Sequence, residues 1–239
     1  MTGGSLHLVP NLLGQVAPEA VLPAHTIEVA RSLSHWVVET EKPARAFLKT
    51  LALPRPIATL SIAPLPAGDD PAAHAALLAP ASAGMDVGLL SDAGCPGVAD
   101  PGSRLVAAAH AAGIRVVPLV GPSSLLLALM ASGMNGQSFA FHGYLPVPEA
   151  DRAATLRRLE DESRIQDRTQ IFIETPYRNA AMIQTLGTAL RAGTQVCVAC
   201  DLTLATETVE RRPASAWRTE DATRFAKRPA IFVLHAGRR

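Results

Sequence analysis

The sequence SDAGCPGVADPG, residues 91–102, places three glycines and two prolines within twelve positions. It follows the apolar run DVGLLS around Leu89 and precedes an alanine-rich stretch from Arg104 to Ala112, which predict a buried strand and a helix. Glycine lets the backbone bend or approach a ligand closely, and proline stiffens it. Because ligands bind beyond the carboxyl ends of strands in an open parallel sheet, this loop is predicted to border a binding site.

Strand-like and helix-like stretches alternate around this loop in the first half of the chain. Buried strands are predicted at SLHLV near Leu6, HWVVE near Val37, DVGLLS near Leu89 and IRVVPL near Val117, and helices at Ile27–Leu33 and Pro43–Leu51. Such alternation predicts a mostly parallel sheet covered on both faces. We therefore expect an N-terminal α/β domain over residues 1–120.

The second half has a different pattern. It opens with FAFHGYLP and a charged stretch, Glu149 to Arg164, in which Leu156 and Leu159 predict a surface helix that packs one narrow face. The strand QIFIE, a helix over Asn179–Ala192 and the closely spaced runs VCVACD, TETVERR and AIFVLH follow. The short spacing of the last runs indicates hairpins, so we expect a C-terminal α/β domain with a mixed sheet over residues 121–239.

Composition sets broad limits on the function. The 239 residues are 48% hydrophobic, enough for a real core, and the formal charge of +1 neither demands nor forbids a nucleic-acid partner. Three cysteines and the lack of a basic-then-apolar leader predict a reducing cytoplasm. Cys197 and Cys200 lie three apart in a predicted strand and so face opposite sides of a sheet, which predicts no metal site.

Two further stretches bear on membranes and on access to the site. The nearly uncharged segment Val116–Met134 contains the sequence GPSS, so it is predicted to form a buried strand, a turn and a buried helix, with no membrane span. The proline-rich segment Pro54–Pro71 is predicted to be a loop or a lid.

The carboxylates and hydroxyls of the loops are candidate ligand contacts. Asp92 directly follows a strand, where it can accept hydrogen bonds from an amine or a ribose hydroxyl. Asp100 either caps the following helix, with Pro101 in the first turn, or takes part in catalysis. Ser123 and Ser124 are placed at the start of the next helix, where they can cap it or hold a carboxylate.

Five motifs in order carry a family resemblance. They are VPNLLG at Val9, SDAGCPGVADPG at Ser91, VPLVGPSSLLLAL at Val117, FHGYLP at Phe141 and IFIETPYRN at Ile171. Together they resemble the tetrapyrrole methylase superfamily, and within it the ribosomal small subunit methyltransferase I branch.

The resemblance implies a two-domain α/β tetrapyrrole methylase-like fold, a cofactor cleft between the domains, a homodimer, and S-adenosylmethionine as the cofactor. It also implies a set of cofactor-contacting positions. These are Leu13, Asp92, Cys95, Ser123, Ser124 and Ala230.

The chain departs from the branch in two segments where the family's acceptor binds. The usual VPTPIGN-type first loop is replaced by VPNLLGQ, and the AEDTR-type segment by VETEKPARAFLK. Glu39 and Arg45 occupy the second segment and are predicted to make substitute contacts with the substrate.

Methyl transfer from a sulfonium is an in-line displacement, so the protein mainly aligns donor and acceptor and removes a proton from a weakly acidic hydroxyl. Glu174, at the end of QIFIE, is predicted to orient or deprotonate such a hydroxyl; alternatively, it is a structural carboxylate paired with Arg178. Arg178, Arg211 and Arg212 suit phosphates and propionates equally, and Arg178 is predicted to bind substrate.

Three functions fit these features. The first is 2′-O-ribose methylation of small-subunit ribosomal RNA, which the branch implies. The second is C-methylation of a porphyrin or corrin precursor, which the superfamily implies. The third is a cofactor-binding regulator without enzymatic activity.

Overall fold

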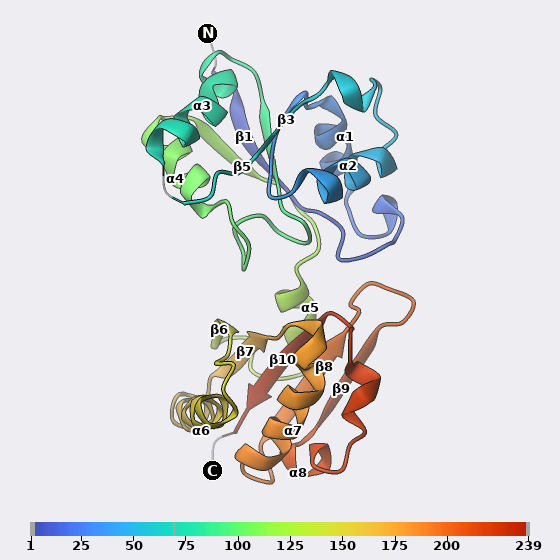
Figure 1. Ribbon diagram of the computed structural model, residues 1–239, viewed down its shortest axis with the longest axis vertical. Coiled ribbons are helices and arrows are strands. Elements are labelled where there is room, and N and C mark those ends of the chain that lie inside the picture. Colours follow the sequence, from blue (N-terminus) through green and yellow to red (C-terminus); the bar gives the residue numbers. More distant parts are fainter. Residues whose placement is uncertain (1–2, 69, 238–239) are drawn as a thin grey trace. The chain divides into compact units, whose positions relative to one another are not determined.

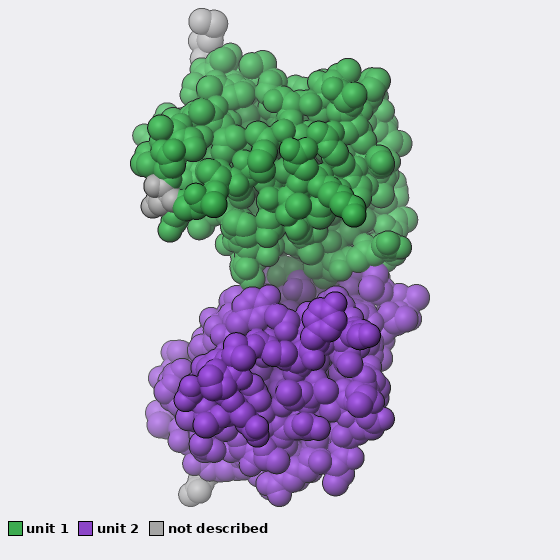
Figure 2. Space-filling model, viewed as in Figure 1, with its two compact units in different colours: residues 1–123 green, residues 124–239 purple. Residues whose placement is uncertain are grey.

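The structure is a computed structural model that describes residues 3–68 and 70–237 (Figure 1). It comprises two compact units, residues 1–123 and residues 124–239, which Figure 2 shows in green and purple. Each unit has its own five-stranded sheet and its own hydrophobic core. The α/β fold class predicted from the sequence is confirmed.

In unit 1 the sheet has the order β3-β2-β4-β1-β5, and every pair of neighbouring strands is parallel. The strands are β1 (Ser5–Val9), β2 (His35–Val38), β3 (Ser61–Pro64), β4 (Val87–Leu90) and β5 (Arg115–Pro118). The helices are α1 (Ala24–Ser32), α2 (Glu41–Thr50), α3 (Pro71–Ser82) and α4 (Ser103–Ala111), with 3-10 turns η1 (Pro18–Ala20) and η2 (Ile57–Thr59).

Both faces of the unit 1 sheet are covered. Helices α1 and α2 contribute to one core, and helices α3 and α4 to the other. The central strand β4 is buried along its whole length, as expected of a parallel strand with helices on both sides. Gly88 of β4 makes room for a large neighbour, since a Cβ at Gly88 would lie 2.8 Å from the indole ring of Trp36. The predicted parallel sheet is confirmed.

The segment 54–71 was expected to be a loop or a lid, and this prediction is wrong for its middle. It contains η2 and then β3, which pairs with β2 at the edge of the sheet and is only partly buried. An edge strand tolerates the proline at its end because one side needs no ladder hydrogen bonds.

The sheet of unit 2 has the order β6-β7-β10-β8-β9 and is mixed, as predicted: β6 and β7 are parallel, and the other pairs are antiparallel. Its strands are β6 (Phe139–Tyr144), β7 (Thr169–Ile173), β8 (Gln195–Cys200), β9 (Thr208–Pro213) and β10 (Ala230–His235). Its helices are α5 (Ser124–Ser132), α6 (Glu149–Gln166), α7 (Asn179–Ala189) and α8 (Ala214–Trp217), with 3-10 turns η3 (Pro176–Arg178) and η4 (Ala222–Phe225).

The core of unit 2 forms between this sheet and the helices that follow β6. Phe172 and Phe232 stack with ring centroids 5.7 Å apart, and Leu156 and Leu159 of α6 are fully buried, as the sequence indicated. The thiols of β8, at positions 197 and 200, are free and buried, and burial raises the pKa of each to about 11. Both therefore stay protonated at neutral pH.

Helix α5 is less buried than the sequence predicted. It packs against strands β8, β9 and β10, yet Leu126 is 51% and Met130 76% exposed. None of the helices in the described part of the chain has the length and hydropathy needed to cross a membrane.

Candidate functional site

The carboxyl ends of β1, β2, β4 and β5 lie along one edge of the unit 1 sheet because these strands run in parallel. The segments that leave this edge are residues 10–17, the start of α2, the loop of residues 91–102, and residues 119–123. The unit 1 residues predicted to bind cofactor or substrate lie in these segments. They are Leu13, Glu39, Arg45, Asp92, Cys95, Asp100 and Ser123.

Asn11 ties the first loop to the glycine-rich loop. Its side-chain Nδ2 donates to the backbone carbonyls of Ser91 at 2.9 Å and Asp92 at 3.0 Å, and its backbone N–H donates to the carbonyl of Gly94 at 2.8 Å. Its Oδ1 accepts from the N–H of Leu12. Asn11 is a residue of the altered first loop that sequence reasoning did not single out, because its partners lie about eighty positions away.

The turn before Ser123 is held against both of these loops. A Cβ at Gly121 would lie 2.4 Å from the Cβ of Pro10, so only glycine permits this approach. The thiol of Cys95 donates to the carbonyl of Pro122 at 3.4 Å. The glycine-rich loop that carries Cys95 therefore lies beside the turn that leads to Ser123.

Three carboxylates gather where β2 and β4 end. The Oε2 of Glu39 accepts from the backbone N–H of Asp92 at 3.0 Å. Burial and the negative charges of Glu39 and Asp92 raise the pKa of Asp100 from 3.8 to about 6. Burial and Asp100 raise the pKa of the Cys95 thiol. The side chains of Glu39, Asp92 and Asp100, hereafter the carboxylate cluster, form no ion pair with any residue that the structure describes.

Asp100 does not cap α4, and this alternative from the sequence is wrong. The cap residue is Gly102, with φ of +126° and no side-chain hydrogen bond, and Pro101 lies outside the helix. The turn needs glycine for two reasons. Residues with a side chain rarely adopt this φ, and a Cβ at Gly102 would lie 3.0 Å from a methyl group of Leu89. Asp100 is therefore left in the loop, near the other two carboxylates.

A cavity of about 600 Å³ opens at this edge, in the size range of small-molecule sites. It brings together two predicted cofactor residues, Leu13 and Asp92, and both segments in which the chain departs from the family pattern. Its lining comprises Asn11, Leu12, Leu13, Gly14, Gln15, Val16, Ala17, Pro43, Ala46, Phe47, Thr50, Asp92 and Ala93.

Arg45 does not line this cavity. Its guanidinium pairs with Glu41 one turn earlier on α2, with Nη2 and Oε2 3.1 Å apart, and both side chains are about half exposed. The structure brings Glu39 to the carboxylate cluster and leaves Arg45 on the exposed face of its helix.

In unit 2, Glu174 directly follows β7 and its side chain is 1% exposed. The Oε1 accepts from the N–H of Thr175 at 2.7 Å and from Arg178, whose Nε lies 2.9 Å away and whose Nη2 also donates. The Oε2 is buried with no hydrogen-bond partner among the described residues. The ion pair with Arg178 that the sequence offered as an alternative is confirmed.

Ala230 lies beside Glu174. Ile231 pairs with Ile173 in the antiparallel ladder of β10 and β7, so the residues next to them, Ala230 and Glu174, are neighbours at the sheet edge. Ser124 is the first residue of α5, as predicted for the second serine.

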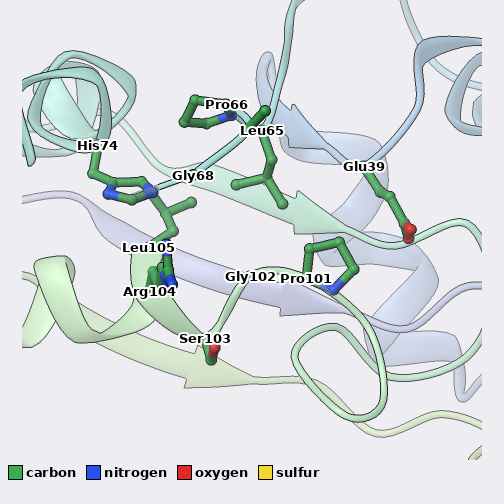
Figure 3. A pocket seen from close by; sticks show the side chains of 11 residues that line it. Glu39, Leu65, Pro66, Gly68, His74, Pro101, Gly102, Ser103, Arg104 and Leu105 are labelled. Atoms are coloured by element: carbon green, nitrogen blue, oxygen red, sulfur yellow. The ribbon is translucent and has the colours of Figure 1, made fainter. Parts of the chain in front are cut away.

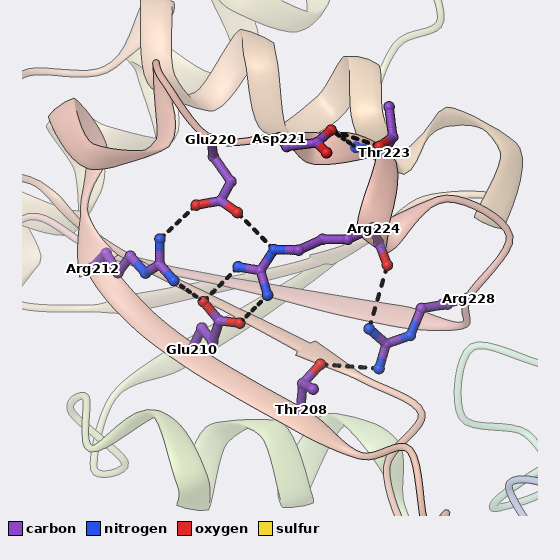
Figure 4. Close-up of polar contacts among 8 residues, drawn as sticks. All are labelled: Thr208, Glu210, Arg212, Glu220, Asp221, Thr223, Arg224 and Arg228. Carbon is purple, nitrogen blue, oxygen red and sulfur yellow. Dashed lines mark hydrogen bonds and ion pairs between the residues drawn. The ribbon is translucent and has the colours of Figure 1, made fainter.

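The two arginines of β9 are occupied by partners within unit 2. Arg212 pairs with Glu210 and Glu220, and Arg224 bridges the same two carboxylates (Figure 4). Arg211 donates to the carbonyls of residues 132 and 133 and to Gln195. Of the three arginines considered from the sequence, only Arg178 pairs with another predicted site residue, Glu174, among the described residues.

Comparisons with known proteins agree with this architecture. A family model described as Tetrapyrrole (Corrin/Porphyrin) Methylases matches residues 28–216. A curated relative from Xylella fastidiosa, named ribosomal RNA small subunit methyltransferase I, is 32% identical over 233 residues, which span 98% of this chain and 81% of the relative.

Solved structures share the fold. A diphthine synthase superposes with a TM-score of 0.69 at 14% identity and covers 98% of this chain and 90% of its own. A uroporphyrin-III C-methyltransferase from Thermus thermophilus, solved with S-adenosylhomocysteine, gives a TM-score of 0.54 at 19% identity and covers 97% of both chains. The chain belongs to the tetrapyrrole (corrin/porphyrin) methylase family and is a methyltransferase that uses S-adenosylmethionine.

Proposed function

We propose that this methyltransferase acts on ribosomal RNA of the small subunit and methylates a ribose 2′-hydroxyl. The observation that carries this proposal is the similarity to a ribosomal RNA small subunit methyltransferase I along nearly the whole chain. The carboxylate cluster supports it, because a cationic donor and a weakly acidic hydroxyl both require negative or basic groups nearby.

The residues at the unit 1 edge suit S-adenosylmethionine. When bound, this cofactor supplies a methyl group on a positively charged sulfur. Asp92 is proposed to accept hydrogen bonds from its amine or ribose hydroxyls, and Leu13 to provide an apolar wall of the 600 Å³ cavity. No residue in the described part of the chain pairs a cation with the carboxylate cluster, which would attract the sulfonium. Cys95, Ser123, Ser124 and Ala230 complete the proposed contacts.

Asp100 is the proposed general base. Its pKa of about 6 makes it a better proton acceptor near neutral pH than an ordinary aspartate, yet it remains ionised above that pH. Glu174 was the other predicted catalytic residue. Because it is buried and holds Arg178, we propose that it positions this guanidinium toward a phosphate of the acceptor. Glu39 and Arg45 remain proposed substrate contacts.

The acceptor is tested by transfer of labelled methyl groups. The purified chain is incubated with labelled S-adenosylmethionine and either small ribosomal subunits from cells that lack the gene or a porphyrin precursor. Label in a ribose of the RNA supports the proposal. Label only in the tetrapyrrole contradicts it and favours C-methylation. Calorimetric cofactor binding without transfer to either substrate favours a regulator.

We also propose that the chain works in the cytoplasm as a homodimer. Three free thiols suit a reducing compartment, and the exposed apolar side chains of Leu126 and Met130 suit a surface that a second copy covers. Sedimentation measurements test the assembly: we expect a dimer that Met130→Asp weakens. A monomer at all concentrations contradicts this assignment.

A further inference from the structure

A second cavity, of about 430 Å³, lies in unit 1 between the segment after β3 and the start of α4 (Figure 3). None of the predicted cofactor residues lines it. Its lining comprises Glu39, Leu65, Pro66, Ala67, Gly68, His74, Pro101, Gly102, Ser103, Arg104 and Leu105.

The N-terminus of α4 forms part of the wall. The nine-residue helix begins at Ser103, and its first helical hydrogen bond runs from the N–H of Val106 to the carbonyl of Gly102 at 3.0 Å. Gly102 has no side chain that can accept from the N–H groups of the first turn. The helix dipole adds positive potential at this end, which favours an anion.

His74 provides an independent indication of a ligand. It lies on α3, is only 4% exposed, and points its imidazole into the same cavity (Figure 3). No described residue makes a hydrogen bond with the ring. The side chain of His74 is thus more than nine-tenths buried, has no described partner and faces the cavity, where a ligand with hydrogen-bond acceptors can pair with the ring.

The cavity has two unlike ends. Ser103, Arg104 and His74 lie at one end, and Glu39 lies at the other (Figure 3). The oxygen Oε2 of Glu39 accepts from the N–H of Asp92, within the carboxylate cluster. An anion at the α4 end would thus meet the hydroxyl of Ser103, the imidazole of His74 and helix N–H groups, while the Oε2 of Glu39 accepts from the N–H of Asp92.

We propose that this end of the cavity binds a phosphate group, and that the phosphate belongs to the backbone of the RNA acceptor. Phosphate matches the donors because it offers several acceptor oxygens to the N–H groups of a helix N-terminus, to a hydroxyl and to an imidazole. Leu65 and Pro66 add an apolar part to the cavity lining, against which the attached sugar would lie. The assignment to RNA rests on the proposed function, whereas the phosphate site itself does not.

The wild-type protein is tested first, by NMR of backbone amides and of the His74 ring. Inorganic phosphate and a short single-stranded RNA are titrated in separate samples. We expect both to shift the amide signals of residues 103–105 and the His74 ring signals. If neither the amide signals nor the ring signals shift, the phosphate site is overturned. Shifts with phosphate alone overturn its assignment to RNA.

Variants measure what His74 contributes. We expect His74→Leu to weaken RNA binding about tenfold, the usual loss for a hydrogen bond to a charged group, and His74→Gln to retain part of the affinity because it keeps a donor. The matched control is His110→Gln at the exposed last turn of α4. Equal affinities for His74→Leu and the control contradict the proposal.

The two proposals fail in different ways. Methylation of ribosomal RNA without any phosphate-induced shift would leave the proposed function standing and remove this site. A phosphate-induced shift in a chain that methylates no RNA would do the reverse. Circular dichroism of each variant tests whether a lower affinity reflects a loss of fold.

Discussion

The clustered acidic side chains of the two units differ in whether an arginine pairs with them. In unit 2, Glu174, Glu210, Glu220 and Asp201 each pair with an arginine. In unit 1, the carboxylate cluster gathers at the sheet edge with no ion pair among the described residues, and its mutual repulsion contributes to the raised pKa of Asp100. Paired carboxylates stabilise a fold, whereas carboxylates gathered without a cation leave that position to a ligand.

The largest effect is expected from breaking a unit 2 pair. Arg178→Met leaves the Glu174 carboxylate, which is 1% exposed, without its cation. We expect the free energy of unfolding to fall by about 3 kcal/mol, as for other broken buried pairs. Urea denaturation measures this, with Arg45→Met, which breaks an exposed pair on α2, as the control. A loss for Arg178→Met as small as that expected of an exposed pair would show that Glu174 needs no partner.

The next effect concerns cofactor binding in unit 1. Asp92→Asn removes a charged acceptor that lines the 600 Å³ cavity, while the backbone contacts of residue 92 remain. We expect calorimetry to show at least a roughly tenfold weaker affinity for S-adenosylmethionine, with an unchanged melting temperature. Asp86→Asn, at the opposite edge of the sheet, serves as the control. An unchanged affinity would remove Asp92 from the site.

A smaller gain in stability is expected from removing the buried charge of Asp100 and its repulsion by Glu39 and Asp92. The pKa of Asp100 is about 6 in the folded chain against 3.8 normally, so the folded state binds the proton more tightly and loses stability as pH rises between these values. After allowance for solvent screening, Asp100→Asn should raise the free energy of unfolding by about 1 to 2 kcal/mol near pH 8. Urea denaturation at neutral and acid pH should show this gain vanish below the lower value. If Asp100→Asn lowers the free energy of unfolding near pH 8, the raised pKa of Asp100 is contradicted.

The smallest effect is expected in the arginine network of Figure 4. Arg224 bridges Glu210 and Glu220 and helps to lower the pKa of Glu210, but Arg212 pairs with both carboxylates as well. Arg224→Gln should cost less than about 1 kcal/mol in urea denaturation, because the network is partly exposed and Arg212 remains. A cost as large as that of Arg178→Met would remove the contrast between exposed and buried pairs in unit 2.

Local pattern predicted most of the fold. Short apolar runs gave β1, β2, β4 and β5, and the close spacing of the last runs indicated the mixed sheet of unit 2. Strand β3 was missed because SIAP is a short, half-exposed edge strand that ends in a proline. Helix α3 was missed because its alanines give no polar face, so the helical period is absent.

The candidate site was less accessible from sequence. Asp92 follows β4, and position alone placed it at the sheet edge. Three features of the site join segments far apart in the chain. They are the hydrogen bonds of Asn11 to the glycine-rich loop, the hydrogen bond from Asp92 to Glu39, and the cavity around His74. No local pattern reports such contacts, because they depend on the order of strands within the sheet.

We propose above all that the carboxylate cluster of unit 1 holds a cationic ligand. Calorimetry of S-adenosylmethionine and of S-adenosylhomocysteine, whose sulfur is uncharged, tests it directly across the pKa of Asp100. The preference for the charged cofactor should fall several-fold as the pH drops through about 6, because Asp100 becomes neutral. A ratio of the two affinities that does not change with pH would contradict the claim.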